Sequence, residues 1–168
     1  MRSVPNMKNI LIKIIGTTST HTNDDVYENI IRYIGNKKYI NGYGFFPTQN
    51  LDAIARQFHF SETYSNTSTD KKIWHFIIST NDPVSGQELA ILANNVALLF
   101  ASDYQCFYGI DSDKGHPHIH FAVNTYSYHP KQTVLTKNEF ETYIFQIQNL
   151  LSIRYPNAYI QTQWEGDE

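Results

Sequence analysis

The pattern of apolar and polar positions divides the chain into predicted strands and helices. The predicted strands, rich in β-branched and aromatic residues, are segments 8–16, 72–80, 104–110, 117–126 and 158–164. The predicted helices, in which apolar residues recur at helical spacing, are segments 23–35, 50–60, 85–101 and 136–156. Asn23 or Asp24 is a candidate cap for the first helix. Ser85, followed three residues later by Glu88, forms a capping-box pattern at the third.

The order of these elements predicts the fold class. Segments 104–110 and 117–126 are joined by the short turn DSDKG, so these two strands are expected to be antiparallel. Helices alternate with the remaining strands, which predicts an α+β fold with a central antiparallel β-sheet and helices packed on it. A length of 168 residues suits a single domain spanning residues 1–168.

Composition excludes several classes of protein. The net charge of −3 argues against a protein that binds nucleic acid tightly and without specificity, although it is compatible with a local basic groove. The single cysteine, Cys106, excludes a disulfide framework and a cysteine-based zinc site. The apolar N-terminal stretch is interrupted by Lys13 and is too short for a membrane span or a signal peptide, so a cytoplasmic protein is expected.

The candidate chemistry is concentrated in the segment DSDKGHPHIHFAVN, residues 111–124. Alternate residues of a strand point to the same face, so His116, His118 and His120 are expected to face one way. Imidazole is a common metal ligand, and the carboxylates of Asp111 and Asp113 in the preceding turn are near enough to complete or orient such a site. The segment therefore predicts a metal or catalytic site.

This segment resembles the third motif of the MOBP-type relaxases, the mobilisation nucleases of the HUH endonuclease superfamily. Their motif is His-x-Asp-x-x-His-Pro-His-x-His, followed by apolar residues and Asn. Asp113 matches the aspartate of that motif, residues 116–120 match directly, and Asn124 matches the asparagine. KKIWHFIIST is similar to the family strand that precedes the long helix, with a histidine at His75. NIIRYIGN is similar to the N-terminal motif, whose helix carries the nucleophilic tyrosine, here Tyr33.

One position departs from the family motif, because Asp111 stands where relaxases have the first histidine of the metal site. The resemblance then implies Asp111, His118 and His120 as the ligands of a divalent ion. A carboxylate ligand favours Mg²⁺ or Mn²⁺. Around these ligands the resemblance implies His116 and Asp113 as catalytic residues, with His75 and Asn124 in supporting positions.

The resemblance also implies an activity and its partners. Relaxases cleave one DNA strand at a transfer origin by tyrosine attack, which leaves a covalent 5′-phosphotyrosine and a free 3′-OH. A phenol with an ordinary pKa near 10 needs a metal or a base beside it, and Tyr33 is the expected nucleophile, with Tyr27 on the same helix as the alternative. Single-stranded DNA is the expected substrate, accessory DNA-binding proteins and a coupling protein are expected partners, and the chain is expected to be a monomer.

The stretch that follows the tyrosine helix carries both cations and aromatic rings. Lys37, Lys38, Tyr39 and Tyr43 are candidates for neutralising and stacking a single strand of DNA, and a solvated turn is the alternative interpretation.

Two other functions remain open from the sequence. The first is a degenerate relaxase-fold accessory protein that binds origin DNA without cutting it, which the acidic net charge and Asp111 favour. The second is a HIT-like nucleotide hydrolase or transferase with His118 as its nucleophile, although the glycine-rich phosphate-contacting stretch of that family is missing. Relaxases often carry a further C-terminal region, so the chain is either a minimal protein or an excised domain.

Overall fold

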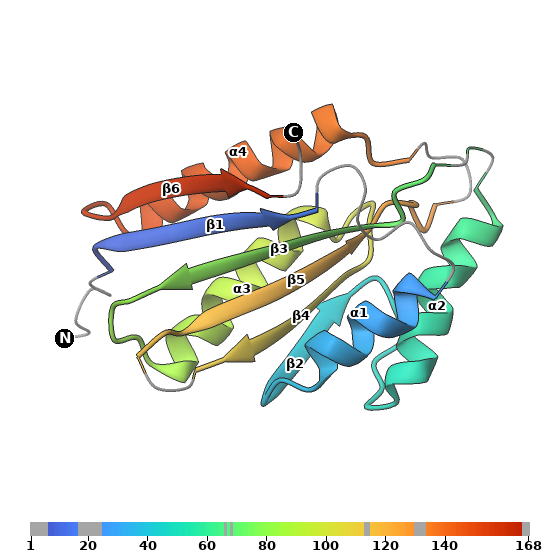
Figure 1. The fold of residues 1–168 in the computed structure, drawn as a ribbon, viewed down its shortest axis with the longest axis horizontal. Helices are drawn as coiled ribbons and strands as arrows, with labels where there is room; N and C mark the ends of the chain where they lie inside the picture. Colours follow the sequence, from blue (N-terminus) through green and yellow to red (C-terminus); the bar gives the residue numbers. More distant parts are fainter. Residues whose placement is uncertain are drawn as a thin grey trace.

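The computed structural model describes residues 7–16, 25–65, 67, 69–112, 115–129 and 134–165. Within these residues, six strands form one sheet in the order β2-β4-β5-β3-β1-β6 (Figure 1). The strands are β1 (Asn9–Ile15), β2 (Tyr39–Tyr43), β3 (Ile73–Thr80), β4 (Cys106–Asp111), β5 (His118–Asn124) and β6 (Tyr159–Trp164). Neighbouring strands are antiparallel except β1 and β6, which run parallel. The α+β prediction is confirmed, and the parallel edge pair makes the sheet mixed.

Four helices in the described residues pack on this sheet. They are α1 (Val26–Gly35), α2 (Leu51–Thr63), α3 (Gly86–Phe100) and α4 (Lys137–Arg154). The Ser85 side chain accepts a hydrogen bond from the amide of Glu88, as the capping pattern predicts. Helix α1 begins after Asp25, and the predicted caps Asn23 and Asp24 lie outside the described residues. None of the described helices is both long and apolar enough to cross a membrane.

The two faces of the sheet bury different helices. Ile119 and Phe121 of β5 point into the larger core, which α3 and α4 cover. Ala122 of the same strand points to the opposite face, where α1 and α2 form a second, smaller core with Ile73 and Phe107. Because residues alternate along β5, its odd-numbered side chains pack in the larger core under α3 and α4. Its even-numbered side chains, which include His118 and His120, point to the face that carries α1 and α2.

Helices α1 and α2 cover only part of their face. Figure 1 shows them over the β2 side of the sheet, with no helix in front of β1 and β6. Along β1, Ile12 and Ile14 are buried under α3 and α4, while Leu11 and Lys13 on the other face are only partly buried. The described part of the chain therefore leaves one half of a sheet face open beside the two-helix layer.

The sequence pattern did not predict strand β2, and a solvated turn was one of two interpretations of the stretch that contains it. Although Tyr39, Ile40 and Tyr43 favour a strand, Asn41 and Gly42 between them do not, so local propensity alone does not predict it. Backbone pairing with β4, from Tyr39 opposite Ile110 to Tyr43 opposite Cys106, stabilises it instead.

Candidate active site

The histidine strand has the predicted geometry, since His118 and His120 alternate with Ile119 and Phe121 and face the α1 side. His120 is 3% exposed, and His118 is partly exposed nearer the end of the sheet. Asp111 lies opposite His118 in the β4–β5 register, with its Oδ2 3.5 Å from His118 Nε2. The structure thus places the three side chains proposed as metal ligands on one face of two neighbouring strands.

Hydrogen bonding determines which nitrogen of His118 is free to bind. Its Nδ1 lies 2.8 Å from the backbone oxygen of His116. A carbonyl oxygen only accepts, so Nδ1 carries the proton and Nε2 of the neutral ring keeps its lone pair. That lone pair faces the carboxylate of Asp111, which is the orientation a metal ligand needs.

The electrostatic surroundings keep His120 uncharged. Burial, and after it the positive charge of Lys37 and that of His118 when its ring is protonated, lower the pKa of His120 to about 4, although Asp111 opposes this change. At pH 7 the ring is therefore neutral and retains a lone pair. Its Nδ1 lies 3.2 Å from Nε2 of His75 on β3, so His75 supports the ring from the neighbouring strand.

These donors suit a divalent ion in their chemistry: two neutral imidazoles and one carboxylate. As the side chains are placed, no three His, Cys, Asp or Glu groups among the described residues converge closely enough to hold a metal. Asp113, predicted beside them, lies outside the described residues. His116 is exposed, and its Nδ1 lies 2.9 Å from Oδ1 of Asn81 in the β3–α3 turn.

Helix α1 brings Tyr33 to the histidines. The ring centroid of Tyr33 lies 5.3 Å from that of His120 and 6.2 Å from that of His75, edge-on to both. Ile30 and Ile34 of α1 are buried in the smaller core. Tyr33 lies at the edge of this buried helix face, and its side chain is 49% exposed. Its phenol is therefore next to the histidine strand and accessible to a ligand.

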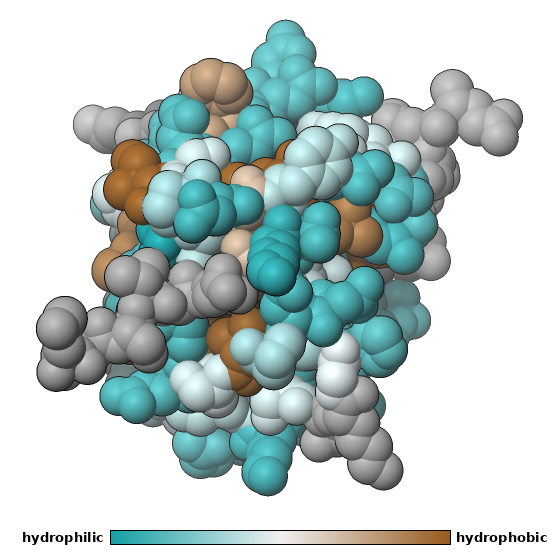
Figure 2. All heavy atoms as spheres, turned by 90° about the vertical axis from the view of Figure 1, so that its left-hand side faces the viewer, coloured by the Kyte–Doolittle hydropathy of each residue, from teal (hydrophilic) through white to brown (hydrophobic). Residues whose placement is uncertain are grey.

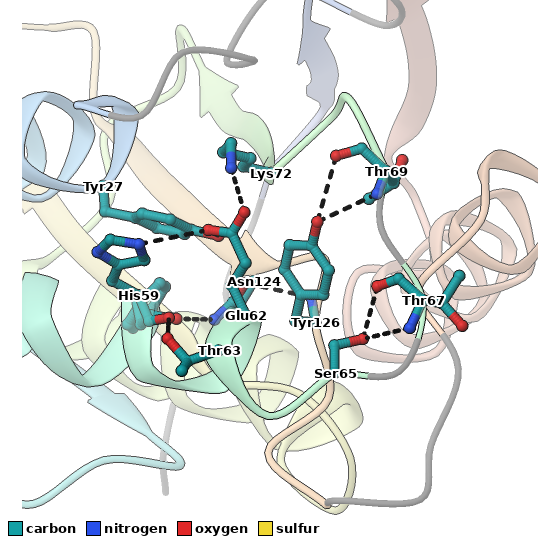
Figure 3. A network of polar contacts seen from close by, with 11 residues as sticks. Tyr27, His59, Glu62, Thr63, Ser65, Thr67, Thr69, Lys72, Asn124 and Tyr126 are labelled. Atoms are coloured by element: carbon teal, nitrogen blue, oxygen red, sulfur yellow. Dashed lines mark hydrogen bonds and ion pairs between the residues drawn. The ribbon is translucent and has the colours of Figure 1, made fainter.

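Tyr27, the alternative nucleophile, is in different surroundings (Figure 3). It is 2% exposed, its hydroxyl donates to Glu62 Oε2 at 3.1 Å, and its ring stacks on His59. Glu62 also forms an ion pair with Lys72. Among the two tyrosines of α1, only Tyr33 lies beside the histidine strand.

Asn124 lies far from His118, at the opposite end of β5, about 20 Å away at the rise of a strand. It is fully buried, and its Nδ2 donates to the backbone oxygen of Phe58 and to Oε1 of Gln105. These bonds fasten α2 to the sheet. Asn124 therefore supports the site only through the position of that helix.

The predicted DNA-binding residues do not share one surface. Lys37 lies over the Tyr33 ring, with its Nζ 4.6 Å from the ring centroid. Tyr43 points to the other face of the sheet, where its hydroxyl contacts Asn94 of α3. Tyr39, four residues earlier in the strand, shares that face. Lys38 is exposed.

The end of the sheet that carries His118 is polar. Strands β1, β5 and β6 begin at this end, and β3 and β4 finish there (Figure 1). Figure 2 shows that face as mainly hydrophilic, with hydrophobic residues in small separate spots. Such a surface suits a charged, hydrated ligand better than a large apolar partner.

Gly109 determines how closely α1 approaches the histidine strand, and the sequence analysis did not identify it. It lies opposite His120 in the β4–β5 register. A methyl group there would lie 2.5 Å from the backbone oxygen of Ile34 and 2.8 Å from Cγ of Lys37. The sequence did contain one indication, since a glycine inside a predicted strand often marks a place where another segment of backbone approaches closely.

Gly109→Ala is expected to push the end of α1 away from β4 and to lower the free energy of unfolding by about 1–3 kcal/mol. The shift should also separate Tyr33 from His120. Chemical denaturation measures the first effect. Gly86→Ala is the control, because an added methyl group there meets nothing within 4 Å. Equal stability of the two variants would show that α1 is not held this closely.

An α+β sheet with a His-x-His strand beside a helix-borne tyrosine defines a domain of the HUH endonuclease class. Residues 33–150, more than half of the chain, match the family described as Relaxase: MobA/VirD2-like, nuclease domain. The chain belongs to this relaxase family. The searches of curated proteins and of solved structures find no match.

Proposed function

We propose that this protein nicks one DNA strand at a transfer origin through a covalent bond to Tyr33, acting on single-stranded DNA in the cytoplasm. The supporting observation is that α1 holds an accessible phenol 5.3 Å, ring to ring, from His120 of the histidine strand. Membership of the relaxase family supports DNA nicking in general. Accessory DNA-binding proteins and a coupling protein are the partners this role requires.

The proposed reaction is a transesterification. The Tyr33 Oη–P bond forms as the P–O3′ bond breaks, so the DNA 5′ phosphate is transferred to the protein. The phenolic proton leaves to solvent, which reaches the half-exposed ring, and the departing 3′ oxygen gains a proton. Asp111, His118 and His120 would hold a divalent metal ion, which would supply charge neutralisation at the scissile phosphate.

The open half of the sheet offers a path for the strand beside Tyr33. The side chains that share this face are Asn9, Leu11, Lys13, Ile77, Ser79, Gln161 and Gln163. They are polar or only partly buried, and a hollow of about 330 Å³ lies among Asn9, Ser79 and Tyr159. Amide and hydroxyl side chains of this kind contact phosphates and sugars.

A second candidate is a DNA-binding accessory protein that does not cut. Asp111 in place of the family histidine favours it, as does the absence of a converged three-ligand set among the described residues. The HIT-like alternative has no support in the family match, which covers both Tyr33 and the histidine strand.

A cleavage assay tests the proposal. The probes are 3′-labelled single-stranded oligonucleotides that tile both strands of the DNA flanking the gene, incubated with Mn²⁺ or with EDTA. A labelled band that migrates with the protein on a denaturing gel is expected for one strand only, and only with Mn²⁺. If every oligonucleotide stays unreacted while one strand is bound specifically, the accessory role replaces the nuclease.

A further inference from the structure

Lys37 is held over the site by its position at the end of α1. Its backbone amide donates to the oxygen of Ile34 at 3.0 Å, which fixes the residue directly after the helix. The side chain then crosses Gly109, since a methyl group on that glycine would lie 2.8 Å from Lys37 Cγ. Its Nζ ends 4.6 Å from the centroid of the Tyr33 ring. The close approach of α1 to Gly109 of β4 therefore also places the ammonium group beside the proposed nucleophile.

This ammonium group has no carboxylate partner among the described residues. Several other cations among the described residues are paired, since Arg32 lies 2.9 Å from Asp52 and Lys13 lies 3.0 Å from Glu165. Lys37 forms no ion pair with any described carboxylate, although its stem is partly buried. An uncompensated cation beside a phenol is a ready site for an anion.

The charge of the neighbouring ligands makes such a cation useful. Asp111 introduces a negative charge where the family motif has a neutral imidazole. A divalent ion bound by Asp111, His118 and His120 would therefore keep less positive charge for the phosphate than one bound by three imidazoles. A fixed ammonium group beside Tyr33 would compensate for that difference.

We propose that Lys37 is a catalytic residue that binds a non-bridging oxygen of the scissile phosphate and stabilises the charge that develops as Tyr33 attacks. This role rests on the proposed function, in which Tyr33 is the nucleophile. Lys37 takes no part in the proton balance, since it remains an ammonium group while the Oη–P bond forms and the P–O3′ bond breaks. Its contribution is electrostatic and greatest in the transition state.

Single-turnover kinetics with the 3′-labelled oligonucleotide that forms the adduct test this role. Lys37→Met keeps the aliphatic stem against Gly109 and removes the charge. At saturating protein it is expected to slow adduct formation about 100-fold or more. Lys37→Arg retains the charge and should lose less than about 10-fold. Arg56→Met, which removes the charge of an exposed arginine on α2, should leave the saturating rate unchanged.

The outcomes separate the two proposals. An unchanged saturating rate in Lys37→Met, with wild-type adduct formed, would refute the role of Lys37 and leave the nuclease intact. A slow rate in Lys37→Arg equal to that of Lys37→Met would show that shape rather than charge matters, and would also refute it. Absence of any adduct from the wild-type protein would refute the proposed function and the role of Lys37 with it. Unchanged melting temperatures of the variants show that their kinetics report on folded protein.

Discussion

Tyr33→Phe is expected to abolish the covalent protein–DNA adduct, with a loss of more than about 1,000-fold in its rate of formation. The substitution removes one oxygen atom, which is the atom proposed to bond to phosphorus. Because Tyr33 is half-exposed and contacts His120 and His75 only edge-on, its hydroxyl contributes little to folding. The melting temperature should therefore stay within about 2 °C of the wild-type value, and the adduct is measured on a denaturing gel.

Tyr27→Phe is the matched control for this prediction, because it makes the same chemical change two helical turns earlier. It removes the hydrogen bond to Glu62 and is expected to cost about 1 kcal/mol of stability. The adduct should still form. An adduct that persists in Tyr33→Phe and is lost in Tyr27→Phe would transfer the nucleophile to Tyr27 and would require α1 to move.

The second large effect is expected at the metal ligands. His118→Ala removes the Nε2 donor that faces Asp111 and should weaken Mn²⁺ binding more than about 100-fold, with an equal or greater loss of cleavage. Calorimetric titration with Mn²⁺ measures the binding directly and does not depend on activity. His129→Ala is the control, since His129 bonds Ser102 at the other end of the sheet.

Asp111→His restores the residue of the family motif and sharpens this test. Three imidazoles should bind softer ions such as Zn²⁺ or Ni²⁺ more tightly than the native set, and Mg²⁺ less tightly. If the ion preference of Asp111→His matched that of the wild-type protein, Asp111 would not be a ligand. Mn²⁺ affinity unaffected by His118→Ala would exclude the three-residue site altogether.

The alternation of side chains along a strand was enough to predict which residues of the histidine strand share a face. The two-residue period of a strand predicts that His118 and His120 share a face with Ile119 and Phe121 on the other, and the structure has this arrangement. Alternation within one strand does not place Asp111, which belongs to β4. Its position beside His118 follows from the register between β4 and β5. The resemblance to the family motif, rather than periodicity, pointed to Tyr33. Amphipathic spacing predicts which face of a helix is buried, but it does not predict what a residue at the edge of that face contacts.

Other parts of the site depend on long-range pairing. Strand β2 contains Asn41 and Gly42, which are unfavourable in strands, and it forms because β4 supplies its hydrogen bonds. This pairing turns Tyr39 and Tyr43 away from the histidines. Asn124 matches a family motif yet is placed where its amide secures α2.

The sequence by itself determined the fold class and the faces of the histidine strand, and the motif resemblance pointed to Tyr33 as a candidate. These follow from the residue-by-residue periods of helices and strands and from one contiguous segment. The tertiary structure alone shows which tyrosine lies beside the histidines and which lysine lies over the ring of that tyrosine. It also shows that a larger residue at position 109 would collide with α1. Those contacts join α1, β4 and β5, which are brought together by packing between segments more than 70 residues apart in the chain.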